Sequence, residues 1–203
     1  MYDIKIPGWI SENELKHIEL LSSMIPENGN VLEVGSFCGR SSFAWANSIP
    51  TSATLYCVDP WEGVIIPNEY QQIGNLGWSM SKQQKFTTIP DDMIFIGTLN
   101  DFLHNTSDCK NIITKQGYSA EILPTFTDTK FDLIFLDGDH TNPIFKSDLR
   151  LSYPLIKQGG ILCGHDFIIE FGNVIMETKK FCAEHNLNLS FYPNSSIWVI
   201  KFP

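Results

Sequence analysis

The sequence predicts an α/β fold with a doubly wound, mostly parallel sheet of seven strands. Segments typical of strands alternate with segments typical of helices, which places helices on both faces of a parallel sheet. The runs at 31–34 and 131–136 are largely apolar, as strands buried on both faces are. The last two strands, expected at 187–192 and 196–202, are joined by the short turn 193–195 and should form an antiparallel hairpin at one edge.

The N-terminal part of the chain supplies the first elements of this alternation. A helix is expected at 12–25, where an S-x-x-E capping box precedes apolar residues at helical spacing. A strand at 31–34 leads through a glycine turn into a second helix that opens at Arg40. The next strand, 54–58, ends at Asp59.

The C-terminal part continues the pattern. Strands are expected at 111–116, 131–136 and 161–164, and helices at 119–126, 142–156 and 172–185. Pro143 in the first turn of helix 142–156 and the Gly159-Gly160 pair after it are typical start and stop signals.

The segment 60–108 is long for a connection between two strands. Its scattered glycines, prolines and aromatic residues suit a mobile lid over an acceptor site. An extra helical layer or a dimer contact would suit them equally well. We therefore expect a single domain, 1–203, that contains this segment as an insertion.

The composition excludes several classes of binding partner for the protein. The 203 residues include 14 Lys+Arg and 23 Asp+Glu, for a net charge of −9, which argues against binding nucleic acid or an anionic membrane surface. No targeting segment and no apolar run long enough to span a bilayer is visible. The five cysteines are scattered without a C-x-x-C motif, so neither a disulfide framework nor a zinc site is expected. These features predict a cytoplasmic protein with a small-molecule partner, and they leave a homo-oligomer open.

The ends of the first two strands carry features that could bind a nucleoside. In open α/β sheets, ligands lie outside the carboxyl ends of the strands. Gly35 and Gly39 frame a turn that lacks both the middle glycine of dinucleotide-binding loops and the lysine of phosphate-binding loops. Asp59 follows roughly 20 residues later, where an acid can bind both hydroxyls of a ribose. A plain turn followed by a solvated acid is the alternative, although the two features together are more specific than either alone.

The ends of the strands at 131–136 and 161–164 carry acids and histidines. The sequence D-G-D-H spans 137–140, and H-D spans 165–166. If the two strands are neighbours, these side chains converge on one cleft, where carboxylate oxygens suit a hard cation such as Mg²⁺. Helix capping, for example by Asp139, is the alternative interpretation.

Together these motifs resemble those of class I S-adenosylmethionine-dependent methyltransferases. The likeness covers most of the chain and lies in the segments 31–42, 58–61, 131–140 and 159–166. The D-G-D-H and G-H-D pair is particularly similar to a bacterial subgroup of small methyltransferases related to macrolide-sugar and catechol O-methyltransferases. The resemblance implies a Rossmann-like fold and S-adenosylmethionine as the cofactor.

The resemblance also implies roles for individual residues around the cofactor. Residues of the first loop and the following helix would line the methionine moiety: Glu33, Gly35, Ser36, Gly39, Ser41 and Ser42. The ribose would be held by Asp59, with Pro60 and Trp61 beside it. The adenine would contact the turn formed by Gly117, Tyr118 and Ser119, and Asp137 would lie at the same edge.

In metal-dependent relatives, acids at the ends of the fourth and fifth strands bind Mg²⁺, and the matching residues here are Asp137 and Asp166. Phe167 stands where the catechol enzymes have an asparagine ligand. The resemblance therefore leaves the third ligand open between Asp139, His165 and water, and it leaves the use of Mg²⁺ open as well.

The chemistry expected from this site is O-methyl transfer to a small hydroxylated acceptor. The cofactor's methyl group is already electrophilic, so the protein has only to align the acceptor and remove a proton. His140 or His165 could be the general base, because an imidazole titrates near neutral pH. The acceptor is not specified, and N-methylation is not excluded.

Three other readings share parts of this pattern. A nicotinamide oxidoreductase would have the fold and the ribose acid, but the middle glycine of its loop is missing. A metal hydrolase could use the acids and histidines, but it would not need the glycine turn. A non-catalytic cofactor-binding protein would have no reason to bring Asp137, His140, His165 and Asp166 together.

Overall fold

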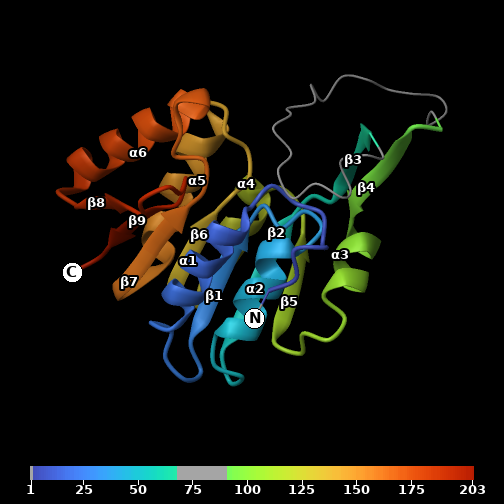
Figure 1. The fold of residues 1–203 in the computed structure, drawn as a ribbon. Helices are drawn as coiled ribbons and strands as arrows, with labels where there is room; N and C mark the ends of the chain where they lie inside the picture. The colour runs from blue at the N-terminus through green and yellow to red at the C-terminus, as the bar shows by residue number, and fades with distance from the viewer. Residues whose placement is uncertain (1, 68–90) are drawn as a thin grey trace.

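The computed structural model of the chain describes residues 2–67 and 91–203 and confirms the predicted sheet (Figure 1). The seven strands lie in the order β5-β2-β1-β6-β7-β9-β8. The parallel strands are β1 (Asn30–Val34), β2 (Thr54–Asp59), β5 (Ile112–Gln116), β6 (Phe131–Leu136) and β7 (Ile156–Gly164). The antiparallel edge hairpin consists of β8 (Leu189–Phe191) and β9 (Trp198–Lys201), with β9 paired to β7.

Helices cover both faces of the sheet, as a doubly wound fold requires. One face packs against α1 (Glu12–Ser22), α2 (Arg40–Ser48) and α3 (Leu99–Asn105). The other packs against α4 (Ser119–Ile122), α5 (Ile144–Ser152) and α6 (Gly172–His185). Strand order reverses between β1 and β6, so the carboxyl ends of these two strands form the topological switch point. Among the described residues, no helix combines the length and apolar character needed to cross a membrane.

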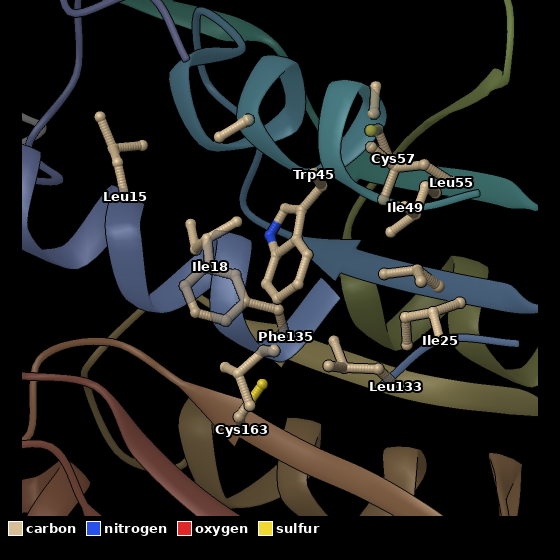
Figure 2. Close-up of a cluster of buried hydrophobic side chains, with 14 of the residues drawn as sticks. Leu15, Ile18, Ile25, Trp45, Ile49, Leu55, Cys57, Leu133, Phe135 and Cys163 are labelled. Carbon is tan, nitrogen blue, oxygen red and sulfur yellow. The ribbon is translucent and has the colours of Figure 1, made fainter. Parts of the chain in front are cut away.

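Alternate residues of the central strands divide between two buried clusters. On β6, Leu133 and Phe135 face the cluster beneath α1 and α2, whereas Ile134 and Leu136 face the opposite cluster. This period of two is what a strand buried on both faces produces. Figure 2 shows the first cluster, where the indole of Trp45 points from α2 toward Phe135, with their ring centroids 5.6 Å apart.

The helix predicted at 142–156 is shorter than expected. It ends at Ser152, a 3₁₀ turn containing Pro154 follows, and β7 already begins at Ile156. Gly159 and Gly160 therefore lie inside a strand and do not stop the helix. They lie where β7 shifts its register against β6, and the φ of +75° at Gly159 fits a bulge better than a regular strand.

The described parts of the 60–108 insertion form elements that the sequence analysis did not predict. Strands β3 (Glu62–Pro67) and β4 (Met93–Thr98) pair in a separate antiparallel two-stranded sheet. Helix α3 follows directly, with a capping box between Thr98 and Asp101. The ribbon packs through Ile66 and Ile96 onto Cys38 of the loop after β1. Residues 68–90, on which the expectation of a lid mainly depends, lie outside the described residues.

We expect Trp45 to be the largest single contributor to the core under α1 and α2. It is fully buried, and none of the described residues accepts a hydrogen bond from its indole N–H. Trp45→Ala should therefore lower the free energy of unfolding by about 3–5 kcal/mol, because it leaves a cavity. Trp45→Phe should cost only about 1 kcal/mol, since it loses no hydrogen bond. Urea unfolding measures both values, and equal losses for the two variants would contradict this account.

Candidate active site

Backbone hydrogen bonds extend the parallel ladder past the carboxyl ends of the strands. The N–H groups that begin the following loops donate to carbonyls at the ends of the neighbouring strands: Gly35 to Val58 (2.8 Å), Asp137 to Val34 (2.8 Å), His165 to Leu136 (3.1 Å) and Gly117 to Asp59 (3.0 Å). The loops expected to bind the cofactor and those carrying the acids therefore start side by side at one edge of the sheet.

Gly35 is required by this close approach. Its φ is +89°, and a Cβ atom at this position would lie 2.2 Å from the carbonyl oxygen of Asp137. A side chain here would strain the backbone and push apart the loops after β1 and β6. The glycine therefore lets a cofactor loop and an acid-bearing loop meet directly at the switch point.

Glu33 lies beneath the loop after β1. Its side chain is fully buried, and the hydroxyl of Ser42 on α2 donates a hydrogen bond to it. Burial raises the pKa of Glu33 to about 7, because it disfavours the carboxylate more than the hydroxyls of Ser41, Ser42 and Ser36 favour it. Glu33 thus ties the end of β1 to α2 through Ser42, and its side chain has no exposed surface.

Asp59 joins the two loops that follow β1 and β2. Its carboxylate accepts hydrogen bonds from the backbone N–H groups of Phe37 (2.9 Å) and Trp61 (2.6 Å). The indole of Trp61 donates in return to the carbonyl of Phe37 (2.8 Å) and packs on Phe102. Burial raises the pKa of Asp59, and the backbone donors partly offset this rise. The acid therefore fixes the shape of the loop from Gly35 to Gly39.

The turn after β5 lies beside the same edge. The hydroxyl of Tyr118 donates to Glu62 (2.6 Å), and that of Ser119 donates to Asp148 of α5 (2.5 Å). The carbonyl of Pro60 accepts from the side-chain amide of the last residue of β5 (3.2 Å). Of the expected adenine turn, Gly117 thus lies at the end of β2, Tyr118 reaches the start of β3, and Ser119 lies against α5.

The acids and histidines at the ends of β6 and β7 converge. Ligand atoms of Asp137, His165 and Asp166 all lie within 4.8 Å of one another. The Nδ1 atom of His165 is 3.3 Å from Asp137 Oδ1 and 3.2 Å from Asp166 Oδ1. The other carboxylate oxygen of Asp166 is 3.1 Å from Nε2 of His140. Asp137, His140, His165 and Asp166 therefore do come together, which a non-catalytic cofactor-binding protein would have no reason to require.

His165 is surrounded by negative charge on both sides of its ring. Its Nε2 atom is 3.2 Å from a carboxylate oxygen of Glu14 on α1. Burial alone would lower the pKa of His165, but Asp137, Asp166 and Glu14 together raise it well above its usual value. The imidazole is therefore held as a cation when no metal ion competes for Nδ1, and in that state it cannot accept a proton.

Two residues lie elsewhere than the sequence analysis expected. Asp139, a candidate metal ligand, accepts hydrogen bonds from the N–H (2.8 Å) and the hydroxyl (2.5 Å) of Thr141 and does not join the three-residue cluster. Glu14, the glutamate of the S-x-x-E capping box, also lies 3.2 Å from Nε2 of His165. No local sequence signal could reveal this contact, because the partner lies at the other end of the chain.

Comparison with known proteins is consistent with this arrangement. A protein family described as a methyltransferase domain matches residues 32–167, which is more than half of the chain. The fold and this match define a methyltransferase domain of the Rossmann-like class. The chain belongs to this methyltransferase domain family. No curated protein matches the chain.

Solved structures with the same fold are distant in sequence. An O-methyltransferase from Bacillus cereus in complex with SAH is 14% identical, with a TM-score of 0.66 over 97% of this chain and 84% of that one. The O-methyltransferase TomG from Streptomyces achromogenes, in complex with SAM, is 13% identical, with a TM-score of 0.61 over 96% and 82%. A methyltransferase from Geobacter sulfurreducens is 12% identical, with a TM-score of 0.65 over 96% and 80%.

Glu33→Gln should remove a pH dependence from the stability of the protein. Because the folded state raises the pKa of Glu33 from 4.5 to about 7, the wild-type protein binds this proton more tightly when folded and loses stability as pH rises through that window. The variant has no such proton to lose. Its free energy of unfolding relative to wild type should therefore rise by about 2.5 kcal/mol between pH 5 and pH 8.

Urea unfolding of both proteins across this range measures the difference. A difference that stays constant from pH 5 to pH 8 would contradict the raised pKa.

Proposed function

We propose that the protein transfers a methyl group from S-adenosylmethionine to a hydroxyl group of a small acceptor, with the help of a divalent cation. The observation that carries the proposal is the meeting of two kinds of loop at the switch point. A glycine turn, with the acid Asp59 beside it, lies against loops that bear three acids and two histidines. A methyl donor and a proton-removing site must be adjacent in such a reaction.

The cofactor would be held by the loops after β1, β2 and β5. Gly39, with φ +91°, opens α2, whose first N–H groups can receive the methionine carboxylate. Both oxygens of Asp59 accept backbone hydrogen bonds, and the acceptor capacity that remains would serve the ribose hydroxyls. When bound, S-adenosylmethionine supplies a methyl group that needs no covalent activation by the protein.

The residues at the ends of β6 and β7 fit a divalent cation. Neighbouring ligands of an octahedral ion at 2.0–2.1 Å are about 3 Å apart. The Nδ1 atom of His165 lies at 3.3 Å and 3.2 Å from its two carboxylate neighbours, Asp137 and Asp166. Two carboxylates and one imidazole suit Mn²⁺ as well as Mg²⁺. When bound, such a cation lowers the pKa of the acceptor hydroxyl and orients it.

His140 is the better candidate for the general base. About 30% of its side chain is exposed, against 7% for His165. Asp166 and the ring of Phe171, whose centroid lies 4.4 Å away, fix the orientation of its imidazole. With Nε2–H directed at Asp166, Nδ1 is the nitrogen that accepts the proton from the acceptor. A carboxylate that orients a catalytic histidine in this way is a recurring arrangement.

Binding of the cofactor can be tested without knowing the acceptor. S-adenosylhomocysteine should bind and raise the melting temperature, whereas NAD should do neither. Asp59→Asn should weaken S-adenosylhomocysteine at least about tenfold, because hydrogen bonds to a charged acceptor are worth about 1.5–3 kcal/mol. The matched control is Asp128→Asn, an exposed acid in a loop at the opposite end of β6. Stabilisation by NAD alone would favour the oxidoreductase reading.

The role of the cation is tested at its proposed ligands. Asp137→Ala and Asp166→Ala should each lower methyl transfer from radiolabelled S-adenosylmethionine to a panel of phenols and sugars by a factor of about 100 or more. EDTA should have a comparable effect on the wild-type enzyme, and Mg²⁺ or Mn²⁺ should reverse it. Turnover that survives both substitutions and EDTA would overturn the metal-assisted mechanism while leaving cofactor binding intact.

A further inference from the structure

Glu14 occupies a position that its role as a helix cap does not explain. It lies in the first turn of α1, is only 8% exposed, and directs one carboxylate oxygen at Nε2 of His165, 3.2 Å away. We propose that Glu14 is a positioning residue, which holds His165 so that Nδ1 faces the cation. This inference rests on the proposed function, because it assigns a task to the same metal site.

The two oxygens of Glu14 have separate partners. Oε2 accepts hydrogen bonds from the N–H (3.0 Å) and the hydroxyl (2.7 Å) of Ser11 and thereby completes the capping box. Oε1 accepts from the N–H (2.9 Å) and the hydroxyl (2.7 Å) of Ser196, which lies in the segment before β9. The carboxylate is therefore fixed from two sides, and only one of its oxygens is needed for the cap.

The backbone around His165 is fixed by the same C-terminal segment. The indole of Trp198 donates to the carbonyl of His165 (3.1 Å), and the N–H of Phe167 donates to the carbonyl of Ser196 (2.8 Å). The main chain on both sides of the imidazole is thus held by β9 and the residues before it. The orientation of the ring is then set by the carboxylates beside it, of which Glu14 is the one that faces Nε2.

The consequence for the metal site follows from the two nitrogens of the ring. In the neutral ring that carries its hydrogen on Nε2, near Glu14, the free lone pair belongs to Nδ1, which lies 3.3 Å and 3.2 Å from carboxylate oxygens of Asp137 and Asp166. A carboxylate that accepts from the far nitrogen of a metal-binding histidine fixes the tautomer and the ring orientation and makes it a better ligand. An uncharged residue could complete the cap, so the second carboxylate oxygen serves the contacts with Ser196 and with His165.

Glu14→Gln separates the two roles of the residue. Glutamine keeps an S-x-x-Q capping box, so the start of α1 is preserved. Mn²⁺ binding measured by isothermal titration calorimetry and by electron paramagnetic resonance should weaken 10- to 100-fold. The affinity for S-adenosylhomocysteine, measured without metal, should stay within twofold of the wild-type value. Glu14→Asp should weaken Mn²⁺ less than Glu14→Gln, since it keeps the charge and still allows a cap of the kind that Asp101 forms on α3.

Ser11→Ala is the matched control, because it removes the cap partner without touching His165. It should lower the melting temperature and leave the Mn²⁺ affinity unchanged. The inference is overturned if Glu14→Gln binds Mn²⁺ as wild type does, or if Ser11→Ala weakens Mn²⁺ equally. Wild-type protein that binds no Mn²⁺ would also overturn it, together with the metal part of the proposed function. Intact binding of S-adenosylhomocysteine in that case would show that the cofactor assignment survives.

Discussion

The backbone hydrogen bonds beyond the ends of β1, β2 and β6 are the constraint on which the rest of the site depends. They bring the first residue of each loop against a carbonyl at the end of the neighbouring strand, and a Cβ at Gly35 would lie 2.2 Å from the carbonyl oxygen of Asp137. Every loop at this edge therefore starts from a fixed position. Because the loops start from fixed positions, a few of their side chains can hold two reacting molecules in line.

Burying carboxylates at this edge of the sheet costs desolvation free energy, and polar or charged groups beside each carboxylate offset part of that cost. The hydroxyl of Ser42 donates a hydrogen bond to Glu33, whose pKa is raised, and backbone N–H groups donate to Asp59. The carboxylates of Asp137 and Asp166 are balanced by the cationic ring of His165. Such a cluster is costly to stability unless it is fully paired, so a site of this composition is better explained by binding and chemistry than by folding.

Much of this architecture could be predicted from the sequence. Apolar strands followed by chemistry-bearing residues predicted the sheet and the edge at which Asp59, Asp137 and Asp166 lie. The parts that were missed depend on contacts between distant segments. The glycines at 159 and 160 serve a bulge that forms only against β6, and the β3–β4 ribbon forms between segments on either side of residues 68–90. Glu14 does complete the capping box that the sequence predicts, and nothing in the local sequence indicates its second contact, with His165.

The central claim is that one edge of the sheet holds both the methyl donor and a cation held by two acids and a histidine. A crystal structure of the protein with S-adenosylhomocysteine and Mn²⁺, with anomalous difference density recorded for manganese, tests both halves at once. The account predicts the ribose at Asp59 and an anomalous peak between Asp137, His165 and Asp166. Manganese bound away from these residues, or the nucleoside bound away from the loop after β1, would contradict it.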